Sequence, residues 1–293
     1  MTGRGLARPA ALVLTGIVSV QLGAGLAIRL FHESPAAAVT GLRLWSAALF
    51  LLLFGGRGAR AAVAGVLARR DWRSAGVALA FGLCLGAMNF VFYQAIARVP
   101  LGVAVTIEFL GPLAVAIAGS RRMLDLLWVV LAGAGVALLT SGGTAHLDLV
   151  GVVFAALSAA CWAGYIAGSA ATGRRFPGSS GLVIAMLVAA ATVTPAALAT
   201  SDGSLRRPAV LLTGAGVGAL SSAIPYGVEL AALRRLPTRV FGIWMSLEPA
   251  VAALIGLAVA GQHLSAGEWA AIGCVVAACV GAARCAPLRI SEH

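Results

Sequence analysis

Long apolar runs separated by short polar connections dominate the pattern of this chain. A helix needs about 20 mostly apolar residues to cross the hydrocarbon core of a bilayer. Ten runs of roughly this length follow one another, at residues 10–28, 36–54, 75–96, 101–119, 124–141, 149–169, 182–199, 210–233, 240–260 and 266–283. The pattern therefore predicts an all-α polytopic membrane protein with ten transmembrane helices, and it leaves no room for a soluble domain.

Composition supports this interpretation. Hydrophobic residues make up 60% of the 293 residues and charged residues 11%, whereas soluble domains have about 45–50% and about 25%. All 21 basic residues are arginines, and nearly all of them lie outside the apolar runs in short segments, so no basic face for nucleic acid can form. The five cysteines have no CxxC spacing and support neither a disulfide framework nor a metal site. We expect no cofactor, no metal and no nucleic-acid partner.

Arginine bias predicts the orientation, because cytoplasmic segments of membrane proteins are enriched in basic residues. With the N-terminus in the cytoplasm, inside segments hold 16 arginines and outside segments 4, and Arg43 lies within a span. This split favours an even number of spans with both termini cytoplasmic. A signal peptide is the alternative for the N-terminal run, since Arg4 and Arg8 precede it, but the internal repeat of the chain needs this run as a helix, so we expect it to be retained.

An internal repeat divides the chain into residues 1–145 and 146–293. Residues 95–119 match residues 232–256 at an offset of 137, with eight identities in 25 positions. The least common identities pair Arg98 with Arg235, Pro100 with Pro237 and Pro112 with Pro249. Each half would hold five helices, and because five is odd the second half must be inverted in the membrane. Inverted repeats are a common plan of secondary transporters.

Four ionisable residues lie within predicted spans, where a charge costs about 2.5–3.5 kcal/mol on insertion scales. Glu108, Glu229 and Glu248 are interpreted as binding or proton-relay groups in a hydrated cavity, and Arg43 as the structural partner of an acid. Three prolines, which are expected to interrupt spans and free backbone carbonyls, accompany them: Pro112, Pro225 and Pro249.

Neutral polar groups lie in several spans, and with the acids they concentrate in spans one, three, four, six, eight and nine. Asn89 and Tyr93 are four residues apart and share a helix face. Gln21, Trp162 and Tyr226 add polar groups to spans one, six and eight. Small residues at spacing four in spans five and ten permit close helix packing, and the sequence leaves open whether this packing is internal or forms a homodimer.

At this point the chain resembles the ten-helix EamA-type members of the drug/metabolite transporter superfamily, in particular the exporters of threonine and homoserine in the bacterial inner membrane. The stretches that carry the resemblance are residues 19–27, 88–117, 146–151, 160–166 and 220–257. The resemblance implies export of small amino acids, coupled to protons, through a central cavity lined by both halves. The candidate substrate-binding residues within these stretches are Gln21, Asn89, Tyr93, Glu108, Trp162, Tyr226, Glu229 and Glu248. One departure is visible, since many relatives carry Gly-Glu where this chain has Gly261-Gln262.

The sequence thus predicts a secondary-active exporter of small amino acids such as threonine and homoserine, which works by alternating access. Competition between a proton and a cationic substrate for the same glutamates would couple the two. One alternative keeps the class but changes the cargo to another metabolite, an aromatic amino acid or a drug. A second alternative is a membrane-embedded lipid-modifying enzyme, although the four histidines are scattered. We expect no catalytic residues, and a small molecule, protons and lipid as partners.

Overall fold

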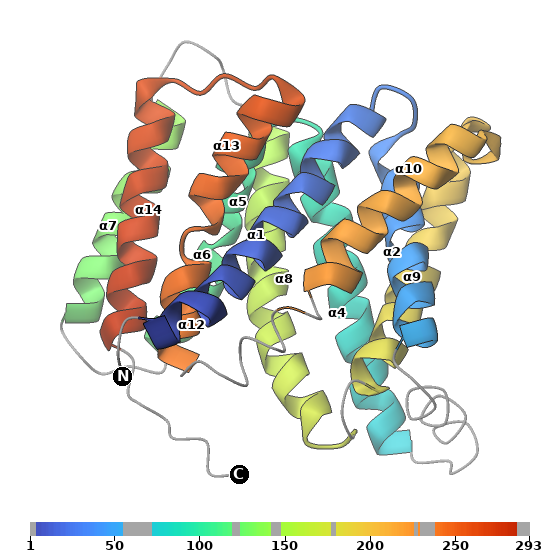
Figure 1. The fold of residues 1–293 in the computed structure, drawn as a ribbon, viewed down its shortest axis with the longest axis horizontal. Coiled ribbons are helices and arrows are strands. Elements are labelled where there is room, and N and C mark those ends of the chain that lie inside the picture. Colours follow the sequence, from blue (N-terminus) through green and yellow to red (C-terminus); the bar gives the residue numbers. More distant parts are fainter. Residues whose placement is uncertain are drawn as a thin grey trace.

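The computed structural model describes residues 4–54, 72–118, 124–141, 148–176, 180–225, 228 and 238–285. Helices account for each predicted apolar run over its described residues, and the described part of the chain contains no strand (Figure 1). In chain order the helices are α1 (Arg4–Leu30), α2 (Ala36–Phe54), α4 (Trp72–Ile96), α5 (Leu101–Glu108), α6 (Leu110–Ala118), α7 (Leu124–Ser141), α8 (Leu149–Gly173), α9 (Ser180–Thr200), α10 (Pro208–Gly218), α12 (Thr238–Met245), α13 (Glu248–Ala260) and α14 (Ala266–Cys285). A 3-10 turn, η1 (Ser204–Arg206), precedes α10, and a π-helical segment, η2 (Ala219–Ala223), follows it.

Eight segments of the described chain are long and apolar enough to cross a membrane, and two more apolar helices, Leu126–Leu139 and Pro208–Ser222, are shorter. The prediction of an all-helical membrane protein is confirmed. The count of ten spans in two inverted repeats, divided at residues 145 and 146, stays a prediction.

Local signals in the sequence account for several helix ends. The side chain of Asp148 caps α8 by accepting from the backbone N–H of Val150 at 2.8 Å. Ser265 and Glu268 form a capping box at the start of α14, in which Glu268 Oε2 accepts from the Ser265 amide at 2.6 Å. Gly261 ends α13 with a φ of 66°, a left-handed conformation that glycine adopts without steric cost.

The helices of the two predicted halves intermingle. α4 packs on α8 and α9, α2 packs on α9, and α7 pairs with α14 at one side of the bundle (Figure 1). α13 lies between α1 and α5 near the centre. The first residues of α1 and the last residues of α14 lie at the same end of the bundle, which is the bottom in Figure 1. We call it the bottom end. The opposite one, where α1 and α13 end and α5 begins, is called the top end.

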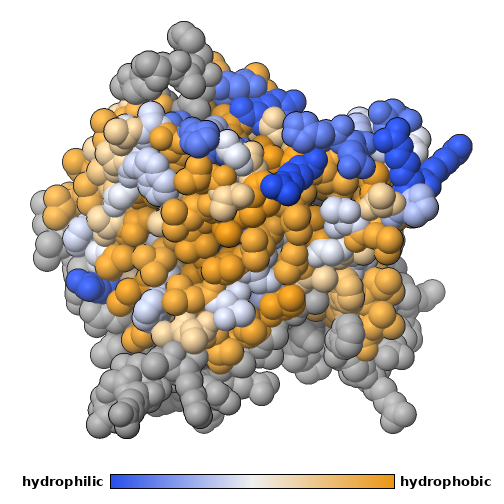
Figure 2. Space-filling model, turned by 45° about the horizontal axis from the view of Figure 1, so that its top comes forward, coloured by the Kyte–Doolittle hydropathy of each residue, from blue (hydrophilic) through white to orange (hydrophobic). Residues whose placement is uncertain are grey.

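The exterior is apolar over a broad area. Large side chains that are exposed in the structure include Leu49, Leu83, Val130, Val153 and Leu212. Figure 2 shows hydrophobic residues across the middle of one face, with hydrophilic residues gathered toward the top end. A soluble protein rarely exposes so large an apolar surface, so this distribution fits a protein that is surrounded by lipid.

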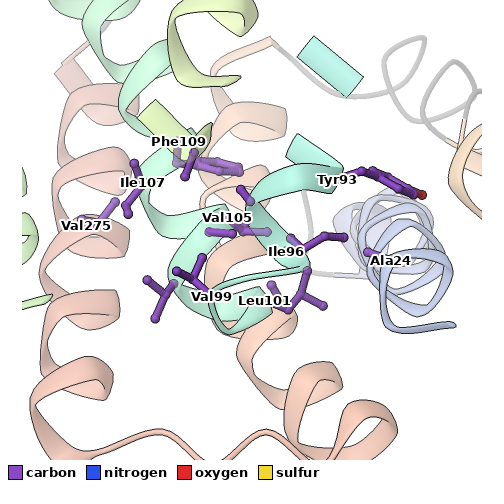
Figure 3. Packing of buried hydrophobic residues seen from close by; sticks show 14 of the residues in the cluster. Ala24, Tyr93, Ile96, Val99, Leu101, Val105, Ile107, Phe109 and Val275 are labelled. Carbon is purple, nitrogen blue, oxygen red and sulfur yellow. The ribbon is translucent and has the colours of Figure 1, made fainter. Parts of the chain in front are cut away.

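Burial differs sharply between the two pieces of the fourth predicted span. All eight residues of α5 are buried, whereas only Gly111 and Leu113 are buried in α6. The α5 residues Leu101, Val105 and Ile107 belong to a cluster that also contains Ala24 of α1, Tyr93 of α4 and Val275 of α14 (Figure 3). The top end is therefore tightly packed around α5.

Candidate functional site

Two of the predicted spans are interrupted near their middle, and each interruption carries a glutamate. Phe109 separates α5 from α6, and Glu108 is the last residue of α5. Ser246 and Leu247 separate α12 from α13, and Glu248 is the first residue of α13. The spans at residues 101–119 and 240–260 are the two that the sequence repeat relates, so both interruptions fall in the repeated segment.

Prolines lie close to these interruptions. Pro112 is in the first turn of α6 and Pro249 in the first turn of α13. Because proline has no backbone N–H, it leaves the carbonyl four residues earlier without its helical partner. For Pro112 this is the carbonyl of Glu108. Pro225, which is buried, follows the π-helical segment η2 and completes the predicted set.

Glu108 is buried, with 9% of its surface exposed, and contacts a serine of another helix. The Ser158 hydroxyl on α8 lies 2.5 Å from Glu108 Oε1. The same hydroxyl oxygen lies 3.3 Å from the carbonyl oxygen of Met88 on α4. Ser158 is fully buried, so its hydroxyl can satisfy its hydrogen-bonding capacity only within the protein.

Glu248 is buried to a similar degree, with 7% exposed. The side-chain amide of Gln21 on α1 donates to Glu248 Oε1 from its Nε2 at 2.9 Å. Gln21 is buried as well, and its carbonyl Oε1 has no hydrogen-bond partner among the described residues. A buried acceptor without a donor is costly, which indicates a place where a polar molecule can bind.

Each glutamate is therefore held by the first helix of the other predicted half. Glu108, from the first half, contacts Ser158 on α8, and Glu248, from the second half, contacts Gln21 on α1. Gln21 and Ser158 are themselves 137 residues apart in the numbering (158 − 21), which equals the offset of the sequence repeat. The structure thus brings two carboxylates into related settings.

Tyr93 and Arg43 form a second polar contact near α1. The Arg43 guanidinium carbon lies 5.3 Å from the centre of the Tyr93 ring, within the range of a cation–π interaction. The Tyr93 hydroxyl is buried near Ser221 of η2 without a hydrogen bond of good geometry to a described residue. Arg43 forms no ion pair with another described residue. Its role as the partner of an acid therefore stays a prediction.

The other predicted binding residues are in different situations. Asn89 is buried but donates to the carbonyl of Leu85 in its own helix at 2.8 Å. The Trp162 ring meets the Phe109 ring edge to face, with centroids 5.0 Å apart. Tyr226 and Glu229 lie outside the described residues.

Trp162 and Phe109 line a cavity of about 300 Å³ on the bottom side of the interruptions. α6, α8, α12 and α14 surround it, and it is almost wholly apolar. Ser246 is among its lining residues, whereas neither Glu108 nor Glu248 is. Residues that line the cavity are neighbours of both acids in the sequence: Phe109 follows Glu108, and Ser246 lies two positions before Glu248.

The structure also adds a residue that sequence reasoning did not select. Ser158 is one of several serines within the predicted spans, and such serines ordinarily bond to their own backbone. No sequence signal distinguishes it except its distance of 137 residues from Gln21. Within the described residues no group of three or more His, Cys, Asp or Glu side chains could hold a metal ion.

Buried acids at interrupted helices of an all-helical membrane bundle are features of a transporter, and comparison with known proteins agrees. The chain belongs to the EamA-like transporter family, whose sequence profile matches residues 149–284. It is a multi-pass inner-membrane transporter rather than an enzyme.

Individual relatives match nearly the whole chain. The threonine/homoserine exporter RhtA of Escherichia coli (strain K12) is 38% identical over 281 residues, covering 93% of this chain and 90% of the relative. RhtA of Salmonella typhimurium (strain LT2) is 38% identical over 284 residues, with the same coverage. A solved protein crystal structure covers 98% of this chain at 18% identity with a TM-score of 0.60, a likeness that concerns the fold alone.

Proposed function

We propose that this protein exports small amino acids such as threonine and homoserine by proton-coupled alternating access, with both termini in the cytoplasm. The identity to relatives that are named threonine/homoserine exporters supports the cargo. The arginine distribution supports the orientation. In this orientation the top end of the bundle faces outward and the bottom end faces the cytoplasm.

The observation that carries the proposal is the placement of Glu108 and Glu248. Both acids are buried at interruptions of helices, and both contact the opposite predicted half. A substrate ammonium that binds one of these carboxylates therefore acts on contacts between the halves. A proton that competes for the same groups can drive the reverse change. Glu229 is included as the third acid of the proposed site.

The packing of the top end supports a state that is closed toward the outside. A side chain at Gly102 of α5 would come within 2.7 Å of Ala253 Cβ on α13. One at Gly25 of α1 would come within 3.2 Å of Val259 Cγ1 on the same helix. Arg29 Nε also donates to the Val259 carbonyl at 2.5 Å. Glycines thus let α1, α5 and α13 approach closely, and export requires these contacts to separate.

An efflux screen tests the cargo and the coupling. Vesicles loaded with radiolabelled threonine, homoserine, serine, an aromatic amino acid or a lipophilic cation would be given an inward or outward proton gradient. We expect efflux of threonine and homoserine that responds to the gradient. Replacement of Glu108, Glu229 or Glu248 by Gln should change rate or pH dependence. If all three variants export as the unmodified protein does, the proposed role of the glutamates is wrong.

One observation favours a different cargo. The cavity beside the interruptions is lined by Phe109, Trp162, Phe241 and Met245 among other apolar groups. Apolar and aromatic walls suit a hydrophobic side chain better than the hydroxyl of threonine. An aromatic amino acid or another apolar metabolite is therefore the second candidate. Efflux of the aromatic amino acid without efflux of threonine would favour it.

A further inference from the structure

We propose that Ser158 is a positioning residue that responds to the protonation of Glu108 and transmits it to α4 by redirecting its hydroxyl hydrogen. This inference rests on the proton coupling proposed above and assigns the coupling proton to Glu108 rather than to Glu248. It is carried by the positions of three oxygen atoms on three helices.

The Ser158 oxygen lies between two acceptors. Glu108 Oε1 on α5 is 2.5 Å away, and the carbonyl oxygen of Met88 on α4 is 3.3 Å away. A serine hydroxyl has one hydrogen to donate and can also accept. It can therefore donate to only one of the two at a time, and the protonation state of Glu108 decides which one.

Two arrangements follow from this count of hydrogens. When Glu108 is ionised, the Ser158 hydroxyl donates to the carboxylate, a charge-assisted hydrogen bond between α8 and α5. When Glu108 is protonated, the carboxylic acid donates to the Ser158 oxygen, and the hydroxyl hydrogen turns to the Met88 carbonyl. Uptake of one proton thus keeps the contact between α8 and α5 and adds a hydrogen bond between α8 and α4. No other group needs to gain or lose a proton.

The helices in this contact come from both predicted halves, which the proposed alternating access moves relative to each other. α4 and α5 belong to the first predicted half and α8 to the second, and α8 packs along both. A bond that forms between α8 and α4 only in the protonated state makes the packing of the two halves depend on the proton. Ser158 itself is fully buried, so water does not replace either bond.

Other ionisable side chains near Glu108 define its electrostatic surroundings. Arg43 on α2 and Cys161 on α8 are close enough to interact with its charge. Other titratable groups on the helices that pack against α5 include Cys84 and Tyr93 on α4, Glu248 on α13 and Cys279 on α14, and Cys84 donates to the carbonyl of Cys161. Among the described residues, none of these groups forms a hydrogen bond with Glu108. Ser158 does, so it is the side chain that responds directly to the proton on Glu108.

The pair of Gln21 and Glu248 lacks this property. An amide NH₂ is a permanent donor, and it cannot pass a hydrogen to a second acceptor by rotating a hydroxyl. A proton on Oε2 of Glu248 leaves Oε1 free to keep accepting from the Gln21 amide. Of the two related contacts, the one with Ser158 has a hydroxyl hydrogen that a proton can redirect to a second described acceptor.

The test is the replacement of Ser158 in the full-length protein, reconstituted in vesicles. Ser158→Ala removes the hydroxyl without adding bulk, and Ser158→Thr retains it. Ser19→Ala is the matched control. Ser19 is also buried, and its hydroxyl donates to the carbonyl of Leu220 on another segment at 2.7 Å. Its described hydrogen bond does not involve an acid. Threonine efflux would be measured across pH, with KM and maximal rate determined separately.

We expect Ser158→Ala to move the pH midpoint of efflux by up to about one unit, because the variant loses one charge-assisted hydrogen bond in the ionised state and two neutral ones in the protonated state, and these losses partly offset. KM for threonine should change less than twofold, because the serine does not hold the substrate. Ser158→Thr should restore the midpoint, and Ser19→Ala should leave it in place.

A second measurement does not depend on transport. The infrared carbonyl band of protonated Glu108, identified by its loss in Glu108→Gln, should shift to higher wavenumber in Ser158→Ala because the acid loses its acceptor. An unchanged band together with an unchanged pH midpoint in Ser158→Ala overturns the inference and leaves the proposed function intact. Threonine efflux that ignores the proton gradient in the unmodified protein overturns the proposed coupling and this inference together.

Discussion

The two interrupted helices place their glutamates at opposite kinds of helix end. Glu108 is the last residue of α5, whereas Glu248 is the first residue of α13. The N-terminal end of a helix carries a partial positive charge and the C-terminal end a partial negative charge. A carboxylate is therefore stabilised at the start of α13 and opposed at the end of α5. The comparison shows that two acids in repeat-related spans need not serve the same purpose.

The hydrogen-bond partners follow the same division. Glu248 receives a permanent amide donor from Gln21, and Glu108 shares a hydroxyl that can donate or accept. The helix end and the hydrogen-bond partner of Glu248 both favour a carboxylate that binds a cation. Those of Glu108 both favour a group that exchanges a proton. Substitutions at the two interruptions can break or sharpen this contrast.

The largest expected effect comes from Glu248→Gln. Removal of the carboxylate takes away a charge-assisted contact to the substrate ammonium, worth about 1.5–3 kcal/mol, so KM for threonine should rise by about 10- to 100-fold. Glu108→Gln should leave KM nearly unchanged but abolish the dependence of efflux on pH. Both parameters would be measured by initial rates in vesicles over a range of pH.

A fluorescence-based thermal denaturation of both variants provides the control, since each Gln keeps the shape of the side chain. If the two substitutions change KM and pH dependence in the same way, the two acids are not specialised and the contrast between the interruptions is wrong.

A smaller effect is expected when the same small change is made in each interrupted span. In Gly111→Ala, on α6, the added Cβ would overlap the carbonyl oxygen of Ala159 on α8. In Gly242→Ala, on α12, the nearest atom is Ala283 Cβ at 3.8 Å, an ordinary contact. Because overpacking against a rigid backbone costs about 1–3 kcal/mol, only Gly111→Ala should lower the thermal stability of the purified protein. Equal losses in the two variants would show that α6 and α12 are packed alike.

Much of the fold could be predicted from the sequence because lipid imposes a simple rule. Apolar runs of sufficient length become helices, and the predicted run at residues 149–169 lies within α8. The interruptions of the helices were less certain from the sequence, because only the prolines within the spans indicated them. Pro195 lies inside α9 without ending it, so a proline alone does not predict a break. Pro112 and Pro249 accompany breaks at places where a buried acid is adjacent.

The site was predicted less completely, because the sequence indicates which residues are buried but not which ones meet. The cost of a charge in lipid identified Glu108 and Glu248. Their partners depend on how α1 and α8 cross α13 and α5, and helix crossing is not encoded in hydropathy. Gln21 is unusual enough in a span to be noticed, whereas Ser158 resembles any serine that bonds to its own helix.

The top ends of the two interrupted spans are linked by Gln262, which follows α13. Its side-chain Oε1 accepts from the backbone N–H of Leu101 at the start of α5 at 2.9 Å. A Cβ on Gly256 would lie 2.7 Å from the same oxygen, so the glycine leaves room for the contact. The amide therefore satisfies an N–H at the first turn of α5.

Gln262→Ala should consequently have the smallest effect, an opening of the top end. One hydrogen bond of about 1 kcal/mol changes the ratio of open to closed forms by about fivefold. The probe is Val99→Cys in a background whose five native cysteines are alanine, because Val99 is buried beside Gln262 in a pocket at the top end. Labelling by a membrane-impermeant thiol reagent should accelerate about fivefold, in line with the same hydrogen bond. Gln262→Glu, which retains an acceptor oxygen at the helix start, should label at the original rate. Equal labelling in all three proteins would mean that packing of α1, α5 and α13 alone closes the top end.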